Sequence, residues 1–455
     1  MTNLLPRLCL LMGVAVAFSC SGAAAAADTS PVGDGRADDT AALQAAIDRA
    51  NGAVVLAKGT YRITEPLVID LDRLGFSGIA GNGVATLLMA GPGPAIRVVG
   101  THFKSADPEG FEDRVWTRQR MPLIDGVGIA GAHEEADGIH AVGTMQLTIS
   151  RVQIRGCRHG IRLLENNRNL VMSDCHLYEN AGIGIFYDDV NLHQSNITGC
   201  HISYNAGGGI VCRKGNIRNL HVTGCDLESN MGADQPPTAN VLIDCRESPF
   251  GTAEVAITGC TIQHNRRAAD SANIRIIGRS EADETVQREG HVTITGNILS
   301  DVFVNVHLQD CRGVTLTGNT LWMGFDHNLL IERCQSVVVG PNSLDRNPRY
   351  RSRQGPQPVN DVVFRDCEDC TITGLHVTNV QGTAAAVTVA DCRRMHIANC
   401  TILDSEAVGL ALIDLVDSRV SGLFIRSDGQ ATGSPPVQIE GGRGNQIDRD
   451  LLGSR

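Results

Sequence analysis

Aromatic residues, lysine and long apolar stretches are scarce in this 455-residue sequence. Aromatic side chains make up 4% of it, so a globular core built on large rings is not expected. Lysine occurs only at Lys58, Lys104 and Lys214, and the net charge is -11. This acidic balance argues against a general nucleic-acid-binding protein. No apolar stretch beyond the first residues is long enough to span a bilayer, so we predict no transmembrane segment.

The first 27 residues have the pattern of an export signal. A short segment ending at Arg7 precedes an apolar run from Leu8 to Phe18, and small residues continue to Ala27. This order is typical of a secretory signal peptide that is cleaved after its small residues. We therefore predict an exported protein, extracellular or periplasmic. A lipid anchor at Cys20 is the alternative.

Glycine is abundant, and much of it belongs to two short phrases that recur along the chain. The first is a bend, written ITGC at Ile197, VTGC at Val222, ITGC at Ile257, ITGN at Ile294 and LTGN at Leu316. The second is a strand, written HGIRLL at His159, GGIVCR at Gly208, ANIRII at Ala272, HNLLIE at His327 and NDVVFR at Asn360. With further copies at Asp137, Ile183, Ala239, Val304, Ala385 and Val408, successive strand phrases start about 22 to 33 residues apart, a period that indicates a solenoid.

Each repeat predicts strands and turns, with no room for a helix. Its short alternating runs are rich in Val, Ile and Thr and are broken by Gly, Asn and Asp. Units that each bury one face of their strands must stack in parallel, which predicts an all-β parallel β-helix. Cys and Asn exchange at one position of the bend. We therefore interpret the thirteen cysteines that follow the signal as buried ladder residues and not as metal ligands.

The segment before the coils carries a family resemblance. GDGRADDTAALQAAI from Gly33, followed by AKGTYRI from Ala57, resembles the N-terminal module of the pectate-lyase superfamily of right-handed parallel β-helices. That superfamily includes polygalacturonases, polysaccharide lyases, epimerases and phage tailspikes. The resemblance implies a right-handed coil and a carbohydrate-active protein, with a polysaccharide as its partner.

The same segment predicts an N-terminal capping helix. In DDTAALQAAIDRA, Leu43 and Ile47 lie on one apolar side, which would close the open end of the solenoid. We predict the signal over 1–27, the cap helix and first strands over 28–70, and coils over 71–455. Insertions lengthen the coils near 102–121, 231–239, 280–290 and 345–360. Loops of this kind often carry function.

Because the interior of a coil is packed, a site must lie on an outer face. There, equivalent side chains of adjacent coils lie about 4.8 Å apart. One outward column of the second phrase runs His140, Arg162, Phe186, Val211, Leu242, Arg275, His307, Leu330 and Val363. Two positions further, the column runs Leu164, Asp188, Arg213, Asp244, Ile277, Gln309, Glu332 and Arg365. Ionisable side chains gather around Arg213, with Glu165, Asp189 and Lys214 beside the second column.

We predict catalytic roles for four residues of this patch: Lys214, Arg213, Asp188 and Asp189. In a lyase acting on a uronate-containing glycan, Asp188, Asp189 and Asp244 would hold Ca²⁺. Lys214 or Arg213 would then abstract the acidified proton. Two alternatives stay open. Paired carboxylates could act as acid and base in glycoside hydrolysis, or the patch could be a solvated ladder of ion pairs.

Substrate contacts are predicted for Arg162, Tyr187, Arg275, His307, Arg349 and Arg351. Arginine suits a sugar carboxylate because its fork binds bidentately, and the loop over 345–360 forms a cationic island in an acidic protein. The apolar middle of the first column, Phe186, Val211 and Leu242, predicts that a loop or a second copy of the chain covers this face.

One further stretch contains acidic residues and histidines, as an active site often does, but lacks the full sequence motif of a known one. HEEADGIH from His133 partly resembles the Asn-Thr-Asp-Gly element of polygalacturonases. Glu135 and Ala136 replace the Asn and Thr, so the polygalacturonase mechanism is not carried over. We interpret this stretch as a charged loop that faces solvent.

Three classes of function fit the sequence. They are an exported carbohydrate-active enzyme, with a polysaccharide lyase first and a glycosidase second; a glycan-binding surface solenoid; and a structural repeat protein. Clustered ionisable groups beside long loops favour the enzyme. The binding solenoid would require a row of exposed aromatics, which five Tyr and two Trp do not supply.

Overall fold

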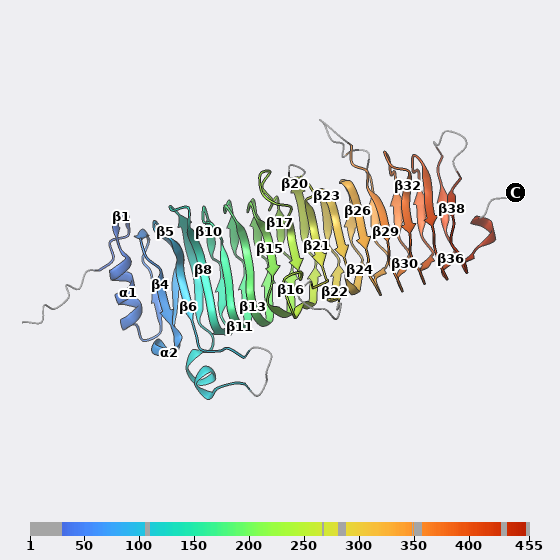
Figure 1. The fold of residues 1–455 in the computed structure, drawn as a ribbon. Helices are drawn as coiled ribbons and strands as arrows, with labels where there is room; N and C mark the ends of the chain where they lie inside the picture. Colours follow the sequence, from blue (N-terminus) through green and yellow to red (C-terminus); the bar gives the residue numbers. More distant parts are fainter. Residues whose placement is uncertain are drawn as a thin grey trace, which may run out of the picture.

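The structure is a computed structural model that describes residues 30–104, 110–265, 268–280, 288–347, 349, 357–428 and 435–451. The predicted signal peptide and Cys20 lie outside the described residues. Within them the chain forms 39 β-strands that pair almost entirely in parallel. Figure 1 shows these strands stacked side by side along one long axis, with blue coils at one end and red coils at the other. The predicted fold class, a right-handed parallel β-helix, is confirmed.

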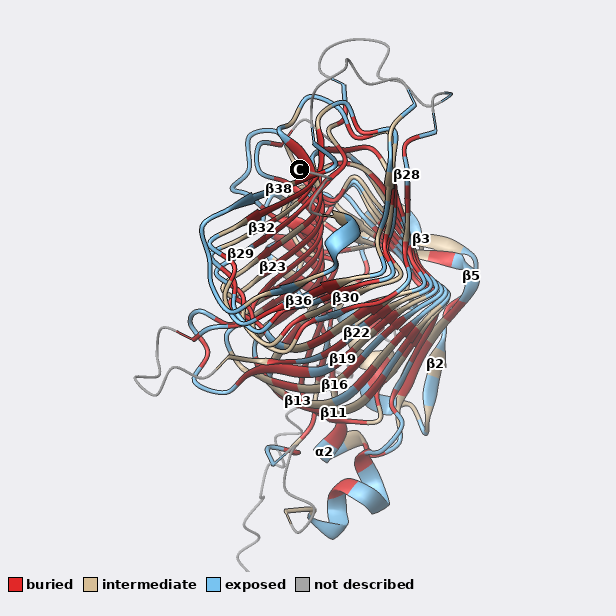
Figure 2. Cartoon of the chain, turned by 90° about the vertical axis from the view of Figure 1, so that its right-hand side faces the viewer, coloured by how far each residue is buried: buried red, intermediate tan, exposed pale blue. Residues whose placement is uncertain are grey.

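Each coil passes through three sheets, which we call A, B and C in the order in which the chain visits them. In one coil, for example, β15 lies in sheet A, β16 in sheet B and β17 in sheet C. The view along the axis shows these faces around a buried interior (Figure 2). Several strands turn a corner and contribute one part to each of two sheets.

Sheet A contains β4 Leu67–Asp70, β6 Gly93–Val99, β8 Ala136–Met145, the first parts of β11 Ile161–Ser173 and β13 Ile183–Thr198, β15 Gly208–Arg213, β18 Ala239–Asp244, β21 Ala272–Ile277, the second part of β23 Ile298–Gln309, β26 Gly324–Glu332, β29 Asp361–Arg365, β32 Ala385–Ala390, β35 Val408–Ile413 and β38 Val437–Glu440.

Sheet B contains β2 Ala53–Val55, the first parts of β5 Gly78–Met89 and β7 Leu123–Gly131, β9 Thr148–Ser150, the second parts of β11 and β13, β16 Asn216–Thr223, β19 Gly251–Thr258, β22 Gly290–Thr295, β24 Arg312–Thr317, β27 Val338–Val339, β30 Thr371–Thr373, β33 His396–Ala398, β36 Arg419–Ser421 and β39 Gln446–Ile447.

Sheet C contains β1 Asp34–Asp38, β3 Gly59–Ile63, the second parts of β5 and β7, β10 Gln153–Arg155, β12 His176–Tyr178, β14 His201–Ser203, β17 Asp226–Glu228, β20 Thr261–Asn265, the first part of β23, β25 Thr320–Leu321, β28 Ser343–Asp345, β31 His376–Thr378, β34 Thr401–Leu403 and β37 Phe424–Arg426.

The predicted N-terminal helix is α1, Thr40–Arg49, and it buries Leu43 and Ile47 as the apolar pattern indicates. Its Gln44 side chain donates to the carbonyl of Val68 at 3.0 Å and accepts from the amide of Val68 at 2.8 Å. Val68 lies in β4, at the open edge of sheet A. The helix therefore supplies hydrogen bonds that a missing coil would otherwise make, as a solenoid cap must.

The insertion over 102–121 folds against this capped end. Its described part includes one turn of π-helix, η1 Val115–Gln119, beside the short helix α2 Leu71–Leu74. Gln119 donates to the Asp72 carboxylate at 3.0 Å and accepts from the amide of Thr101 at 2.9 Å. At the other end of the chain, the turn η2 Arg449–Leu451 follows the last coil.

The recurrent bend phrase forms a ladder inside the coils. The amide of Cys200 points to the sulfur of Cys225 at 3.4 Å, and the amide of Cys260 donates to the side chain of Asn297 at 2.9 Å. Asn297 in turn donates to Asn319 at 3.0 Å. All thirteen described cysteines are free and buried, which confirms that Cys and Asn share one structural role.

Candidate functional site

The strand register of sheet A confirms both outward columns read from the sequence. Arg162 pairs with Phe186, Phe186 with Val211, and Asp188 with Arg213. Further along, Arg275 pairs with His307. Since equivalent side chains of neighbouring coils lie about 4.8 Å apart, each column is a continuous row on the surface. Part of a third row, not considered from sequence, lies two or three residues before the first column: Ala239, Ala272, Val304, His327 and Asp361.

Two of the predicted insertions and one shorter loop lead directly into this surface. The segments 231–238, 268–271 and 357–360 precede β18, β21 and β29, so all three come from the corner between sheets C and A. Figure 1 shows loops rising on one side of the coils near these strands. The third row therefore lies next to long loops, which is where a functional surface of a solenoid is expected.

The middle of this surface is an apolar strip. It consists of Ile183, Phe186, Val211, Ala239, Leu242, Ala272 and Val304. Phe186 is 9% exposed, Val211 0% and Leu242 3%, so the single chain already buries them. Little apolar area remains for a second copy, and an oligomer through this strip stays a prediction.

A compact polar network, the N-terminal network, lies at one end of the strip around Asp137. Arg158 holds this carboxylate with two hydrogen bonds, of 2.9 and 2.7 Å, and His140 contacts it at 2.8 Å. The amide of His159 donates a further bond of 3.0 Å. Asp137 is fully buried. Burial raises its pKa, but the hydrogen bonds from His140 and Arg158 outweigh burial and hold the pKa well below its usual range.

The interpretation of the stretch from His133 as a solvent-facing loop holds for Glu134 and Glu135, which are exposed, but it is wrong for Asp137 and His140. Asp137 is 0% and His140 8% exposed, because Arg158 from the next coil closes over them. The charged residues looked like a surface loop because their partner is remote in sequence. His159 continues the network: Nδ1 accepts from the amide of Ile183 at 3.0 Å. Burial lowers the pKa of His159 to about 4, so its imidazole is neutral at neutral pH.

Arg162 links the network to the apolar strip. Its Nε donates to Asp188 Oδ2 at 2.8 Å, and Nη2 contacts the same oxygen. The guanidinium carbon lies 5.9 Å from the centre of the Phe186 ring, within the range of a cation–π contact. Arg162 is therefore positioned on the outer face as predicted, with part of its fork engaged by a protein carboxylate.

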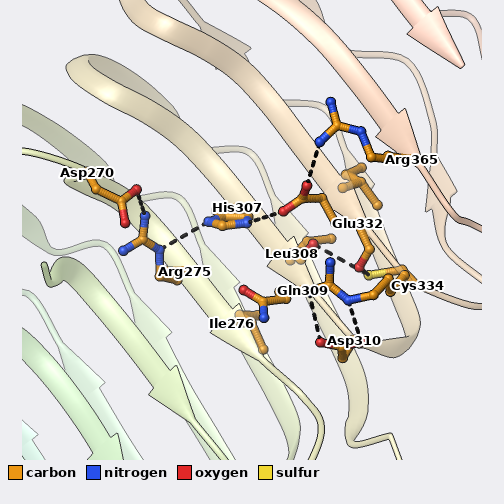
Figure 3. Close-up of polar contacts among 12 residues, drawn as sticks. Asp270, Arg275, Ile276, His307, Leu308, Gln309, Asp310, Glu332, Cys334 and Arg365 are labelled. Atoms are coloured by element: carbon orange, nitrogen blue, oxygen red, sulfur yellow. Dashed lines mark hydrogen bonds and ion pairs between the residues drawn. The ribbon is translucent and has the colours of Figure 1, made fainter. Parts of the chain in front are cut away.

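The C-terminal network, at the other end of the strip, is built on Arg275 (Figure 3). Arg275 is 5% exposed and donates to Asp270 at 2.6 Å and to Nδ1 of His307 at 3.2 Å. Because Nδ1 accepts, the His307 proton is on Nε2, which faces Glu332 at 3.2 Å. Burial and the charge of Arg275 lower the pKa of His307. Arg365 then donates to Glu332 at 3.2 Å.

Beside this chain of contacts lies a group of carboxylates that sequence analysis did not identify. His327 contacts Asp361 at 2.6 Å. Burial lowers the pKa of His327, but the hydrogen bond and charge of Asp361 outweigh burial and raise it. The neighbouring Asp326 is exposed. Partial burial nevertheless raises the pKa of its carboxyl, and the negative charges of Asp270 and Asp361 add to the rise against the opposing effect of His327.

A sequence signal for Asp361 and His327 existed. Both stand at the start of the strand phrase, as HNLLIE and NDVVF show. A column read three positions upstream would have found His327 but aligned it with Asn360, because the strand register shifts by one residue before Val362. Asp326 and Asp270 carry no such signal, because they lie before the repeated positions, where loop lengths differ between coils.

The four predicted catalytic residues lie together on adjacent coils, but their contacts differ from the predicted roles. Lys214 Nζ lies 3.1 Å from Glu247, and this contact raises the pKa of Lys214. A lysine that acts as base must lose its proton readily, which this environment opposes. Asp188 is engaged by Arg162, while Asp189 is exposed at a turn with φ 48°.

Tyr187 is a wrong prediction. Its ring is fully buried in the core, and its hydroxyl contacts that of Ser195 at 2.6 Å. Successive strand residues point to opposite faces. Phe186 and Asp188 point outward, so Tyr187 must point inward and cannot contact a sugar on this surface. Burial raises its pKa as well.

The remaining predicted contacts are dispersed. Arg275 and His307 lie in the C-terminal network. Arg349 is exposed in the loop before β29, where its amide donates to Asn347 at 2.9 Å. Arg351 lies outside the described residues. Among the described residues, no contact joins Arg349 to the networks of sheet A, so its role stays a prediction.

The Ca²⁺ ligand set is not assembled. Asp244 is held by Arg246 through contacts of 2.9 and 2.6 Å, and Asp188 by Arg162. In the part of the chain that the structure describes, no three His, Cys, Asp or Glu side chains are grouped so that they could hold a metal ion. The described residues therefore do not fit the predicted calcium site.

Comparison with known proteins agrees with this architecture. A family described as right-handed β-helix region matches residues 122–248. Rhamnogalacturonase A/epimerase, pectate lyase-like, matches residues 25–102, and periplasmic copper-binding protein (NosD) matches residues 246–423. No curated protein matches the sequence significantly. Each of these family models matches less than half of the chain, and the fold is that of a right-handed parallel β-helix.

Solved structures share the fold at low identity. The tailspike of E. coli bacteriophage HK620, in complex with a pentasaccharide, is 11% identical with a TM-score of 0.54, covering 92% of this chain and 78% of the tailspike. Tailspike protein 3 of bacteriophage CBA120 is 12% identical with a TM-score of 0.50, covering 91% and 60%. The Azotobacter vinelandii mannuronan C-5 epimerase AlgE4 A-module is 16% identical with a TM-score of 0.41, covering 92% and 95%.

One matching family is described as copper-binding, and the cysteines of this chain do not fit such a site. Copper(I) favours thiolate, thioether and imidazole ligands. The thirteen described cysteines are buried. Several of them point to backbone carbonyls of the coil, such as Cys367 to Ile331 at 3.4 Å. These thiols fill the interior and do not fit an exchangeable copper site.

Proposed function

We propose that the protein is an exported enzyme that cleaves an acidic polysaccharide on the outer face of sheet A, by acid–base hydrolysis at the C-terminal network. The observation that carries this proposal is the group of Asp326, Asp270 and Asp361. Three carboxyl groups from neighbouring coils share one region: the pKa of Asp326 is raised, and Asp361 is in contact with His327.

Glycoside hydrolysis needs two carboxyl groups in opposite states. One must keep its proton in order to donate it to the leaving oxygen, and the other must be ionised. The raised pKa of Asp326 suits the acid. Asp361, which His327 contacts at 2.6 Å, suits the second role by its position. Environments that separate the pKa values of neighbouring carboxyls are the physical mark of such a pair.

The cations of the same face favour an acidic substrate. Arg365 is exposed, and its ion pair among the described residues is with Glu332. Arg213 lies two coils before Arg275 in the neighbouring column and is half-buried. Guanidinium forks on a rigid sheet can bind sugar carboxylates bidentately. Lys214, which stays protonated, would add a positive charge there in place of the base role predicted for it.

A polysaccharide lyase remains the second candidate. It is supported by the strand register, which places Arg213 next to Asp188 on the neighbouring coil, and by the cationic Lys214 beside them. Elimination also needs a cation that neutralises the uronate carboxylate. The base for such a reaction would have to be a group other than Lys214.

Export rests on the signal-like first 27 residues, and a periplasmic family among the matches is compatible with it. No helix within the described ranges is both long and apolar enough to cross a membrane.

One assay separates the candidates. Purified protein is mixed with polyuronates and with neutral polysaccharides, and both new reducing ends and the near-ultraviolet absorbance of unsaturated products are followed. Hydrolysis predicts reducing ends without absorbance, lost in Asp326→Asn and kept in the surface control Asp226→Asn. Rising absorbance would replace hydrolysis by elimination. The absence of both signals would leave a glycan-binding or structural solenoid.

A further inference from the structure

A groove of about 510 Å³ lies on sheet B, away from both networks of sheet A. Four of its lining residues, Gln146, Asn169, Gln194 and Asn219, occupy equivalent turns of successive coils, each with φ between 54° and 68°. The row beside them is Thr148, Val171, Asn196 and His221, in register across β9, β11, β13 and β16. We call this surface the amide groove.

The lining is polar but carries no fixed charge. Among the described residues that line it, the side chains are amides, a threonine, a histidine and two apolar groups. Each amide offers both donors and acceptors, as sugar hydroxyls do. Val171 is 37% and Met121 62% exposed, which supplies apolar surface for the C–H faces of a sugar ring. No arginine or lysine is present there to select an acidic group.

The groove has the shape of a site for an extended chain. Its four amides span three steps between coils, about 14 Å at about 4.8 Å a step. At its far end Asn219 donates to Glu254 at 2.7 Å. The last amide of the row is therefore held by a protein carboxylate, which marks the end of the groove.

One atom in the groove indicates an unmet interaction. Oδ1 of Asn169 is buried and accepts no hydrogen bond from any residue that the structure describes. Buried polar atoms without a partner are rare in native proteins. Because this oxygen is closed to solvent, a hydroxyl of a bound chain would satisfy it only after the Asn169 amide turns toward the groove.

We infer that the amide groove binds a neutral oligosaccharide segment, as a second and non-catalytic glycan site. It lies on another sheet from the proposed hydrolytic site, and its contacts share no residue with that site. Binding here is independent of catalysis on sheet A, so either function can fail without the other.

Methionine methyl NMR provides the test, because the sequence has nine methionines and Met121 is exposed in the groove. The Met121 signal is assigned by its loss in Met121→Leu. Neutral hexasaccharides of glucose, mannose and galactose are titrated separately, with a hexauronate as the acidic comparison. We expect at least one neutral hexasaccharide to shift the Met121 signal, with an affinity little changed by salt.

The double variant Asn169→Asp/Gln194→Glu removes two donors and adds two charges, and it should weaken binding by at least about tenfold, or about 1.4 kcal/mol. Gln153→Glu on sheet C is the matched control and should bind normally. If the double variant does not fold, Gln194→Ala replaces it with a smaller expected loss. The inference is overturned if no neutral hexasaccharide shifts Met121, if the hexauronate shifts it equally, or if the groove variants bind unchanged.

Discussion

The two polar networks of sheet A contain the same kinds of side chain and have opposite electrostatics. At the N-terminal network, one carboxylate, Asp137, receives bonds from Arg158, His140 and the amide of His159, and its pKa falls. At the C-terminal network, partial burial raises the pKa of Asp326, and the negative charges of Asp270 and Asp361 add to the rise against the opposing effect of His327.

The difference separates a structural polar group from a reactive one. A buried carboxylate that accepts hydrogen bonds from several donors stays in one protonation state and stabilises the fold. A carboxyl that is crowded by other carboxylates and has no dedicated donor can gain and lose a proton near working pH. The following predictions test whether this contrast holds, from the largest expected effect to the smallest.

Asp326→Asn should remove most glycan-cleaving activity. Loss of a general acid lowers kcat by about 10²- to 10⁴-fold, whereas an exposed Asp-to-Asn change should alter the unfolding free energy by no more than about 0.5 kcal/mol. In the wild-type enzyme the alkaline limb of the kcat profile should lie above the usual range of an aspartate. Kinetics and thermal melting on the same preparations measure both. Unchanged kcat would assign the acid to another residue.

Asp137→Ala should give the reverse pattern. It leaves the buried His140 and the partly exposed Arg158 without their carboxylate. Breaking a fully buried pair costs about 3–5 kcal/mol, and the exposure of Arg158 places this loss at the lower end of that range or below it. Tm should fall strongly, while activity per folded molecule persists. Asp226→Asn, on exposed sheet C, is the control and should melt like the wild type. A small change in Tm would contradict the structural role of the N-terminal network.

Acidification should destabilise the coils near His159. The pKa of this residue is about 4 when folded, against 6.5 for an ordinary histidine. Between these two pH values the unfolded chain therefore binds more protons than the folded chain. The free energy of unfolding is unaffected by His159 above pH 6.5 and declines as the pH falls from 6.5 toward 4. The contribution is at most about 3 kcal/mol. His159→Gln, which keeps an acceptor for Ile183, should flatten the dependence of Tm on pH in this window; an unchanged slope would refute the assignment.

Lys214→Ala should have the smallest effect. Lys214 is exposed and its contact with Glu247 is at the surface, so neither Tm nor hydrolytic kcat should change appreciably. KM for a polyuronate would rise slightly if the charge assists binding. A collapse of kcat accompanied by unsaturated products would restore the lyase with Lys214 as its base.

Much of the architecture could be predicted from the sequence because a solenoid is nearly one-dimensional. Neighbouring coils repeat the same local pattern, so aligned phrases gave the register of Arg162 with Phe186 and of Arg275 with His307 correctly. The cap helix followed from Leu43 and Ile47 alone. Tyr187 was misplaced only because strand alternation was not applied to it.

Partners that depend on loops and on crossed coils could not be predicted. Asp270 reaches Arg275 from a loop whose length no repeat fixes, and Arg158 closes over Asp137 from the following coil. The sequence by itself determined the parallel coil, its ladders and the rows of its outer face, because these follow from short-range periodicity. Only the tertiary structure decided which carboxylates are neutralised and which stay crowded, because a pKa depends on all charges and burial around a group, wherever they lie in the chain.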